Sequence, residues 1–251
     1  MIGAGNVATH ISRHLHFAGH SITCVHSRTH ECSARLAEEV GSVGTVVPEE
    51  VPPTADFFII CVPDRVILSV VRKFQDRKGI WLHTAGACSM EVFEGFQPQF
   101  GVLYPLQTMS KQRVVSLEDT PLLVEGSSPE IAEAIKMLAS TISRNVYEMN
   151  SASRQVIHMA AVFANNFSNH MVHLAQQILE EEKIDAKLLD PLLKETYEKF
   201  GEMGAAAAQT GPALRDDQET MQKHLELLKK HPEWEKLYTF ISQDIGRSRN
   251  E

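Results

Sequence analysis

Residues 3–8 read Gly3-Ala4-Gly5-Asn6-Val7-Ala8, which is the pattern G-x-G-x-x-A. In this pattern Gly3 makes a tight turn, Gly5 lets the backbone approach a pyrophosphate, and Ala8 permits close contact between a helix and a strand. Backbone N–H groups at the start of the following helix then bind the phosphates. We therefore predict a phosphate-binding turn, with cofactor contacts from Gly3, Ala4, Gly5, Asn6 and Val7.

The residues around this turn support the prediction. Val7, Ile11 and Leu15 follow at helical spacing, and residues 21–26 form an apolar, β-branched run of strand length. This order of turn, helix and strand is that of a dinucleotide-binding βαβ unit. Only residues 1–2 precede the turn, where the first strand of such a unit is expected. We expect the sequence to lack several N-terminal residues or to begin at a misassigned start.

The end of the 21–26 run predicts which dinucleotide binds. An NAD site usually has Asp or Glu here, to hold the ribose 2′-hydroxyl. This chain has Ser27, Arg28 and Thr29 instead, and the first acid is Glu31. Arginine can stack on the adenine and pair with a 2′-phosphate, while the two hydroxyl groups can donate hydrogen bonds. The pattern favours NADP(H) as the cofactor; the alternative is a solvated loop arginine.

Strand-length apolar runs alternate with helical patterns through the first part of the chain. The runs lie at 21–26, 43–47, 56–62, 79–83, 101–104 and 122–125, and helical patterns lie at 31–40 and 66–74. Such alternation predicts βαβ units and a mainly parallel sheet. Beyond residue 149 only helical patterns follow, at 151–183, 186–200, 217–230 and 232–245. We predict an α/β, Rossmann-type, doubly wound domain over 1–149 and an all-α domain over 150–251.

Two predicted strands end in residues suited to a ligand site. The carboxyl ends of parallel strands lie at one edge of an open α/β sheet, where ligands bind. The 56–62 strand ends at Val62 and runs into Pro63, and the next strand ends in His83, Thr84 and Ala85. We expect these residues to contact the cofactor, the alternative being ordinary turns at the ends of strands.

The strand at 101–104 leads into the stretch YPLQTMSK, residues 104–111. This stretch is too polar for a plain connection, and it follows a strand end on the same edge. We therefore assign Tyr104, Gln107, Thr108 and Lys111 to substrate binding. The alternative is a structural turn in which the hydroxyl groups form hydrogen bonds with the backbone.

The helical pattern at 151–183 carries a row of amides and imidazoles. At α-helical spacing His158, Asn165, Asn169 and His173 share one stripe, because steps of four and seven nearly complete whole turns. Their neighbours are apolar, so these groups must hydrogen-bond either a substrate or each other. We assign His158, Asn165 and Asn169 to catalysis. Without a nearby carboxylate the histidines are weak metal ligands, and we predict no metal site.

Residues 208–217 interrupt the helical part, and a Gly-Pro pair within them ends a helix. Gln209, Thr210 and Arg215 crowd this turn, and we assign them to substrate binding. Arg215 can hold a substrate carboxylate in a bidentate pair, or it can form an inter-helix salt bridge. Asp217 is placed to cap the next helix, and that role is favoured over catalysis.

Composition excludes several classes of function. The formal net charge of −8 argues against nonspecific nucleic-acid binding, which requires a basic field. No apolar run approaches the ~20 residues of a membrane span, and no signal peptide is evident. The 4 cysteines show no C-x-x-C spacing, which favours reduced thiols. We expect a cytoplasmic protein without a nucleic-acid or membrane partner.

Together these stretches resemble a known family. They are GAGNVA (3–8), VHSRT (25–29), CVPD (61–64), HTAG (83–86), YPLQTMSK (104–111), HMAAVFANNFSNH (158–170) and QTGPALRDD (209–217). They occur in the order found in Rossmann-like NADP oxidoreductases, of the deazaflavin-coenzyme-dependent type, that carry a C-terminal domain of unknown function. Wider relatives are pyrroline-5-carboxylate reductase and the 6-phosphogluconate and 3-hydroxyacid dehydrogenases. The resemblance implies a helical domain like that of 6-phosphogluconate dehydrogenase, which supplies a substrate pocket and a dimer surface.

The resemblance does not identify the catalytic acid. Hydroxyacid dehydrogenases carry a lysine on the corresponding long helix, but residues 151–177 contain none. His158 is the nearest candidate for proton transfer, with Asn165 two turns further along.

Two hypotheses about function remain. The first is an NADP-dependent oxidoreductase that transfers hydride between NADP(H) and a small carbonyl or imine, or a deazaflavin coenzyme. The second is a nucleotide-binding or nucleotide-sensing protein without turnover, which the missing lysine favours. A helical domain this apolar would expose a large face as a monomer, so we also expect a homodimer.

Overall fold

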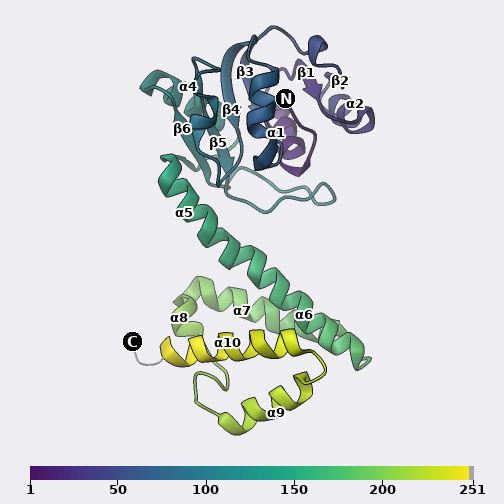
Figure 1. Cartoon of the computed structure of the whole chain (residues 1–251), viewed down its shortest axis with the longest axis vertical. Coiled ribbons are helices and arrows are strands. Elements are labelled where there is room, and N and C mark those ends of the chain that lie inside the picture. Colours follow the sequence, from purple (N-terminus) through teal and green to yellow (C-terminus); the bar gives the residue numbers. More distant parts are fainter. Residues whose placement is uncertain (249–251) are drawn as a thin grey trace. The chain divides into compact units, whose positions relative to one another are not determined.

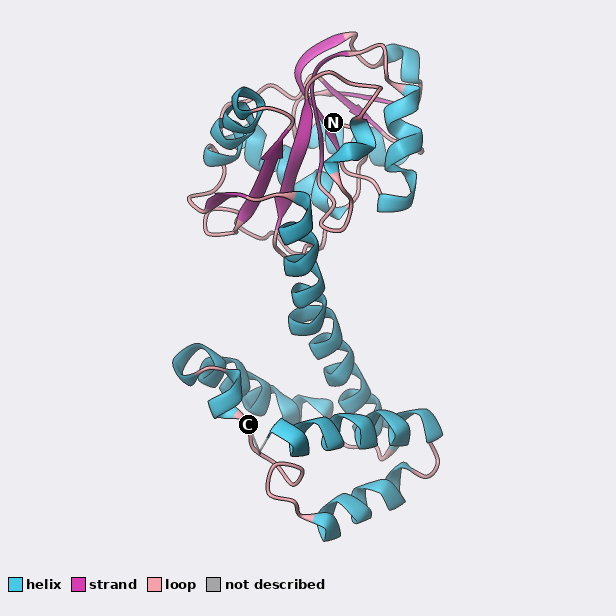
Figure 2. Ribbon diagram, turned by 60° about the vertical axis from the view of Figure 1, so that its left-hand side comes forward, coloured by secondary structure: helices cyan, strands magenta, loops and turns pink. Residues whose placement is uncertain are grey.

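The computed structural model describes residues 1–248 and divides into two compact units, Met1–Met171 and the chain from Val172 onward. The first unit contains a sheet covered by helices, and in the second unit the elements within Val172–Ser248 are helices joined by loops (Figures 1 and 2). This confirms the predicted fold class, a Rossmann-type α/β part followed by a helical part. Over the described range, no helix has the length and apolar character needed to cross a membrane.

The sheet of the first unit is mostly parallel. Its strands are β1 (Cys24–His26), β2 (Val43–Thr45), β3 (Thr54–Ile60), β4 (Lys78–His83), β5 (Phe100–Pro105), β6 (Leu122–Gly126) and β7 (Val146–Glu148). Strand β1 pairs with β2, and the remaining strands follow the order β3-β4-β5-β6-β7. Only the β5–β6 pairing is antiparallel among these named strands.

The N-terminal residues lie between β1 and β3, where the first strand of the βαβ unit is expected. Ile2 makes parallel bridges to His26 and Ile60 and so joins the two sets of strands. The Ile2 N–H donates to the Ile59 carbonyl at 2.8 Å, and the Gly3 N–H donates to the His26 carbonyl at 2.8 Å. Even this short segment therefore pairs with both neighbours, and it places the Gly-rich turn at the carboxyl ends of β1 and β3.

Helices cover both faces of the sheet. One core contains residues of α1 (Asn6–Phe17), α2 (His30–Glu39) and α4 (Pro129–Ser140), and the other contains residues of α3 (Ile67–Lys73). Neighbouring residues of β3 alternate between them, because side chains along a strand point to opposite faces. Ile59 belongs to the first core, and Phe58 and Ile60 belong to the second. This is the doubly wound arrangement predicted from the sequence.

A single long helical segment follows β7. It consists of α5 (Ser151–Ala161), a π-helical stretch (Val162–Phe167) and α6 (Ser168–Glu181). After them come a short 3-10 helix (Ala186–Leu189), α7 (Asp190–Met203), α8 (Ala205–Ala208), α9 (Gln218–Leu228) and α10 (Pro232–Ser248). None of the residues of α6 to α9 is buried. Large apolar side chains are exposed instead, among them Leu188, Leu192, Met203, Leu227 and Phe240.

Helix α4 and strand β7 are not among the elements predicted from the sequence, although α4 has a recognisable start. Ser128 accepts a hydrogen bond from the Ile131 N–H, and Pro129 occupies the first helical position. This Ser-Pro arrangement is a common signal for the N-terminus of a helix. Strand β7 is short and its side chains are partly or fully exposed, so its sequence lacks the apolar run that marked the other strands.

Candidate functional site

The Gly-rich turn has the backbone geometry that its sequence predicts. Gly3 has a φ of +112°, and a Cβ on it would lie 2.2 Å from the Cys61 carbonyl oxygen. Nothing lies within 4 Å of the place a Cβ on Gly5 would take, so that side of the turn is open. Helix α1 then begins at Asn6 with no acidic residue in its first turn. Its unpaired N–H groups can therefore bind an anion, and the residues fit a dinucleotide pyrophosphate.

The residues after β1 form a short turn beside the Gly-rich turn. The Ser27 hydroxyl donates to the Thr29 carbonyl at 2.7 Å. Arg28 is exposed, and within residues 1–248 its side chain forms no hydrogen bond or ion pair with the protein. A free guanidinium and the absence of an acid at residues 26–30 suit a 2′-phosphate better than a 2′-hydroxyl. The exposed Arg28 side chain is therefore available for the NADP(H) contact that the sequence predicts.

Val62 and Pro63 follow β3 next to the Gly-rich turn. The Val62 Cγ1 lies 3.3 Å from the place a Cβ on Gly3 would take, so this side chain packs against the turn. Pro63 is exposed and begins the link to α3. The structure therefore brings both residues to the edge of the sheet that carries the turn.

His83, the last residue of β4, and the two residues after it are buried more deeply than expected for direct side-chain contacts with a cofactor. His83 is fully buried, and Thr84 and Ala85 are 9% and 8% exposed. Nδ1 of His83 accepts a hydrogen bond from the Ala85 N–H at 3.2 Å, and the Thr84 hydroxyl reaches the Ile60 carbonyl at 3.4 Å. Burial, and secondarily the charge of Arg154, lowers the pKa of His83 to about 3. His83 is therefore a neutral structural residue of this turn.

Tyr104 and His158 meet at the same edge of the sheet. The Tyr104 hydroxyl lies 3.1 Å from Nδ1 of His158. A Cβ on Gly86 would lie 2.5 Å from Nδ1 of His158 and 2.9 Å from the Tyr104 ring, so only glycine leaves room for the pair. Burial, followed by the charge of Asp64, raises the pKa of Tyr104, and the phenol stays protonated near neutral pH. The two residues were predicted separately, and the structure joins them.

The start of α5 is fixed by a buried ion pair that sequence reasoning did not single out. Arg154 is fully buried, pairs with Glu125 of β6, and donates to the Cys88 carbonyl at 2.6 Å. Ser151 also donates to Glu125, at 2.7 Å. Because His158 lies one turn beyond Arg154, this anchor positions it beside Tyr104. The sequence does carry a signal for this ion pair, because a glutamate inside the apolar strand LLVEG requires a buried partner.

The π-helical stretch at Val162–Phe167 interrupts the regular spacing that would place His158, Asn165 and Asn169 on one face of the helix. The stripe assumed 3.6 residues per turn throughout, and a π-helix has a wider turn that shifts every later residue around the axis. Asn165 and Asn169 are exposed, and Asn169 lies about 16 Å further along the helix than His158 at 1.5 Å per residue. Their catalytic assignment remains a prediction without a shared helix face to support it.

The three residues after Tyr104 that were assigned to substrate binding lie in two different surroundings. Gln107 and Thr108 are exposed, and the Gln107 side chain accepts from the Thr108 N–H at 2.9 Å. Lys111 instead reaches the Gly-rich turn, where its Nζ donates to the Ala4 carbonyl at 2.6 Å. Of the residues assigned to substrate binding, Lys111 is thus the one that contacts the predicted cofactor turn.

The residues predicted in the second unit lie in one loop before α9. Gln209, Thr210 and Arg215 are exposed, and Arg215 forms no salt bridge with any of residues 1–248. Asp217 accepts from the Thr220 N–H at 3.0 Å, which confirms its role as a helix cap. That hydrogen bond, with a second one from the Thr220 hydroxyl, lowers the pKa of Asp217.

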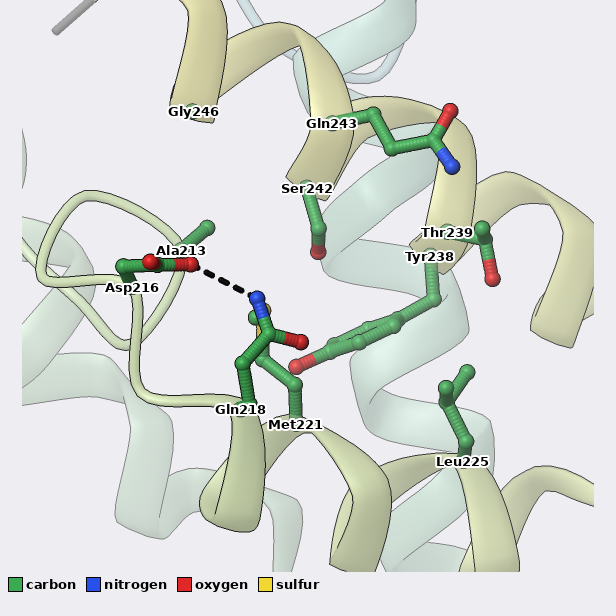
Figure 3. A pocket seen from close by; sticks show the side chains of 10 residues that line it. All are labelled: Ala213, Asp216, Gln218, Met221, Leu225, Tyr238, Thr239, Ser242, Gln243 and Gly246. Carbon is green, nitrogen blue, oxygen red and sulfur yellow. Dashed lines mark hydrogen bonds between the residues drawn. The ribbon is translucent and has the colours of Figure 1, made fainter.

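A pocket of about 290 Å³ adjoins this loop (Figure 3). Ala213 and Asp216 contribute from the loop, while Tyr238 and Gln243 contribute from α10. Gln218 donates to Asp216 at 2.6 Å across its rim. None of the three predicted substrate residues of this loop lines the pocket. Among the described residues, no group of three or more His, Cys, Asp or Glu is gathered to hold a metal ion.

Taken together, the sheet order and the glycine turn define a Rossmann-type dinucleotide-binding protein. Comparison with known families agrees. Residues 1–82 match the family described as NADP oxidoreductase, coenzyme F420-dependent. Residues 120–245 match the domain of unknown function DUF2520. A search among curated proteins found no match.

Solved structures show the same fold. A provisionally assigned NADP oxidoreductase from Bacteroides fragilis is 38% identical, with a TM-score of 0.94 over 98% of this chain and 96% of that one. A reductive aminase from Aspergillus terreus, in complex with NADPH and ethyl-5-oxohexanoate, is 13% identical, with a TM-score of 0.69 over 91% and 85%. An imine reductase from Myxococcus stipitatus, in complex with NADP+, is 16% identical, with a TM-score of 0.62 over 98% and 90%.

The chain therefore belongs to the family of Rossmann-type NADP oxidoreductases whose C-terminal part is the DUF2520 domain. This confirms the family that the sequence motifs resemble.

Proposed function

We propose that this protein is an NADP(H)-dependent reductase of a small carbonyl or imine, with His158 as the proton donor. The observation that carries the proposal is the contact of Nδ1 of His158 with the Tyr104 hydroxyl at 3.1 Å, on the sheet edge that also holds the phosphate-binding turn. The fold neighbours that reduce imines, or bind NADPH with a keto ester, support this substrate class.

In the proposed complex the Gly-rich turn holds the pyrophosphate and Arg28 pairs with the 2′-phosphate. Bound NADPH supplies the hydride. The protein supplies position and a proton. In protonated His158, Nδ1–H donates to the Tyr104 oxygen, and Nε2–H is free to give a proton to the substrate oxygen or nitrogen. Within residues 1–248, no protein hydrogen bond occupies that Nε2.

This assignment is tested with a panel of small ketones, aldehydes and cyclic imines, by following NADPH oxidation. His158→Ala is expected to keep NADPH affinity and to lose substrate-dependent turnover. If the wild-type protein binds NADPH but oxidises it with none of these substrates, and with no deazaflavin, the nucleotide-sensing function replaces the reductase. If it binds no dinucleotide, both functions are excluded.

We also propose that residues 1–149 are the cofactor domain, and that residues 150–251 bind substrate and mediate a homodimer. Support for the dimer comes from the helices of the second unit, where Leu188, Leu227 and Phe240 are 70%, 73% and 69% exposed. Apolar surface of this extent normally marks an interaction site. Light scattering after size exclusion should give twice the 28.0 kDa of one chain. A species of one chain's mass at micromolar concentration would refute the dimer.

A further inference from the structure

Lys111 is brought to the Gly-rich turn from a distant part of the chain. It lies in the long loop between β5 and β6 (Figure 1), and its Nζ donates to the carbonyl oxygen of Ala4 at 2.6 Å. Ala4 is the middle residue of the G-x-G turn. The contact therefore joins residues that are 107 positions apart in the sequence.

The loop is held in this position by α1, the helix that starts at the turn. Nε2 of His10 is 3.1 Å from the Ser110 carbonyl and must carry the hydrogen, because a carbonyl oxygen can only accept. Nε2 of His14 accepts from the Leu117 N–H at 3.2 Å. His10 is fully buried. Lys111 is thus placed by contacts on both sides of it, rather than by its own hydrogen bond alone.

Among the described residues, no carboxylate pairs with the positive charge of Lys111. An ammonium group has three N–H donors, and the one protein partner found for it in residues 1–248 is the neutral Ala4 carbonyl. It forms no ion pair within that range, although the chain carries a net charge of −8. The side chain is partly buried. The first turn of α1 has no acidic residue either, so its N–H groups and the Lys111 ammonium together attract an anion.

We infer that Lys111 binds the pyrophosphate of the dinucleotide, and does not bind the substrate. This rests on the proposed cofactor site. Its remaining N–H donors supply charge-assisted hydrogen bonds to the phosphate oxygens that the turn and α1 hold from the other side. Since NAD(H) and NADP(H) share the pyrophosphate, Lys111 contributes equally to the affinity for both. Arg28, by contrast, selects the dinucleotide that carries a 2′-phosphate.

The test is calorimetric titration of the full chain with NADPH and with NADH, for the wild type, Lys111→Met, Lys111→Arg and Arg28→Met. Lys78→Met is the matched control. Lys78 is exposed at the start of β4, whereas the candidate site lies at the carboxyl end of the sheet strands. We expect Lys111→Met to raise both Kd values about tenfold, the loss typical of one charge-assisted contact. Lys111→Arg should recover most of the affinity, and added KCl should weaken the wild type more than Lys111→Met.

Competition by adenosine 2′-monophosphate separates the two cations. This probe carries the 2′-phosphate and no pyrophosphate, so its affinity should fall in Arg28→Met and stay unchanged in Lys111→Met. If folded Lys111→Met, with a wild-type circular dichroism spectrum, binds both dinucleotides as tightly as the wild type, the inference is wrong. It is also wrong if only NADPH binding weakens. If the wild type binds neither dinucleotide, the proposed function fails, and the inference fails with it.

Discussion

The Tyr104 hydroxyl and Nδ1 of His158 are 3.1 Å apart, although 54 residues separate them in the chain. The contact depends on Gly86, since a Cβ there would overlap the imidazole. The phenol keeps its proton near neutral pH, because burial raises its pKa. Tyr104 therefore acts on His158 as a neutral hydrogen-bond partner and orients the ring.

Tyr104→Phe should lower kcat by about 10–100-fold, because a misplaced catalytic group can cost up to about 10²-fold, and leave the Kd for NADPH unchanged. Steady-state NADPH oxidation, with a ketone, aldehyde or imine that the wild type reduces, measures kcat. Tyr147→Phe is the control, because Tyr147 is 51% exposed on β7 and should have wild-type kcat. Equal kcat for Tyr104→Phe and wild type would remove Tyr104 from the mechanism.

Arg28→Met should raise the Kd for NADPH by about 10–100-fold and leave the Kd for NADH within about twofold. The estimate is the loss of one or two hydrogen bonds to a charged phosphate. Arg35→Met removes the same charge from an exposed position on α2 and should change neither Kd. A parallel loss of affinity for both dinucleotides in Arg28→Met would contradict a 2′-phosphate contact.

Gly3→Ala should destabilise the fold by at least about 2 kcal/mol, because it combines left-handed strain with a clash against the Cys61 carbonyl. Gly19→Ala separates the two causes. Gly19 also has a positive φ, +91°, but a Cβ there meets nothing within 4 Å, so the cost should be about 1 kcal/mol. Urea unfolding at pH 7 compares the two, and equal losses would show that the clash is relieved.

His83 should make the protein sensitive to mild acid. Its pKa is about 3 in the folded chain, whereas an unfolded histidine has a pKa of about 6.5. Between about pH 6.5 and pH 3, His83 therefore binds a proton in the unfolded chain but not in the folded chain. The free energy of unfolding should fall as the pH drops from about 6.5 towards 3, by up to about 1.4 kcal/mol per pH unit.

His83→Asn checks this, since an amide oxygen can replace Nδ1 as acceptor of the Ala85 N–H without titrating. Its free energy of unfolding should depend less on pH between pH 4 and pH 6 than that of the wild type, whatever its stability at pH 7. His16→Asn, at an exposed position on α1, should keep the wild-type slope. An unchanged slope in His83→Asn would rule out His83 as the source.

Arg154→Met should cost about 3–5 kcal/mol, because it leaves Glu125 largely buried without its partner. Arg144→Met breaks two exposed ion pairs, with Glu118 and Asp119, and should cost less than about 1 kcal/mol. Denaturant unfolding measures both. Amide hydrogen exchange of α5 should also increase in Arg154→Met, and unchanged exchange would show that the helix has another anchor.

Much of the fold follows from local sequence. The glycine turn, the helix after it and the apolar run at β3 are recognisable because backbone conformation and burial on two faces restrict which residues fit. Strand β7 is different: it is short, half exposed and paired on β6, so neighbouring residues carry little trace of it. The start of α4, by contrast, carries a local signal, the Ser128 cap followed by Pro129.

In the candidate site too, some features follow from local sequence and others depend on tertiary structure. By itself the sequence determined the phosphate-binding turn, the arginine after β1 and the placement of the strand-end loops at one sheet edge, because these depend on neighbouring residues and strand direction. The tertiary structure decided that Tyr104 meets His158, that His83 is buried, that Arg154 anchors α5 on Glu125, and that Lys111 lies on the turn. Each of these contacts joins segments far apart in the chain, and a spacing rule applies only while the helix keeps 3.6 residues per turn. The π-helical stretch at Val162–Phe167 ends that regularity.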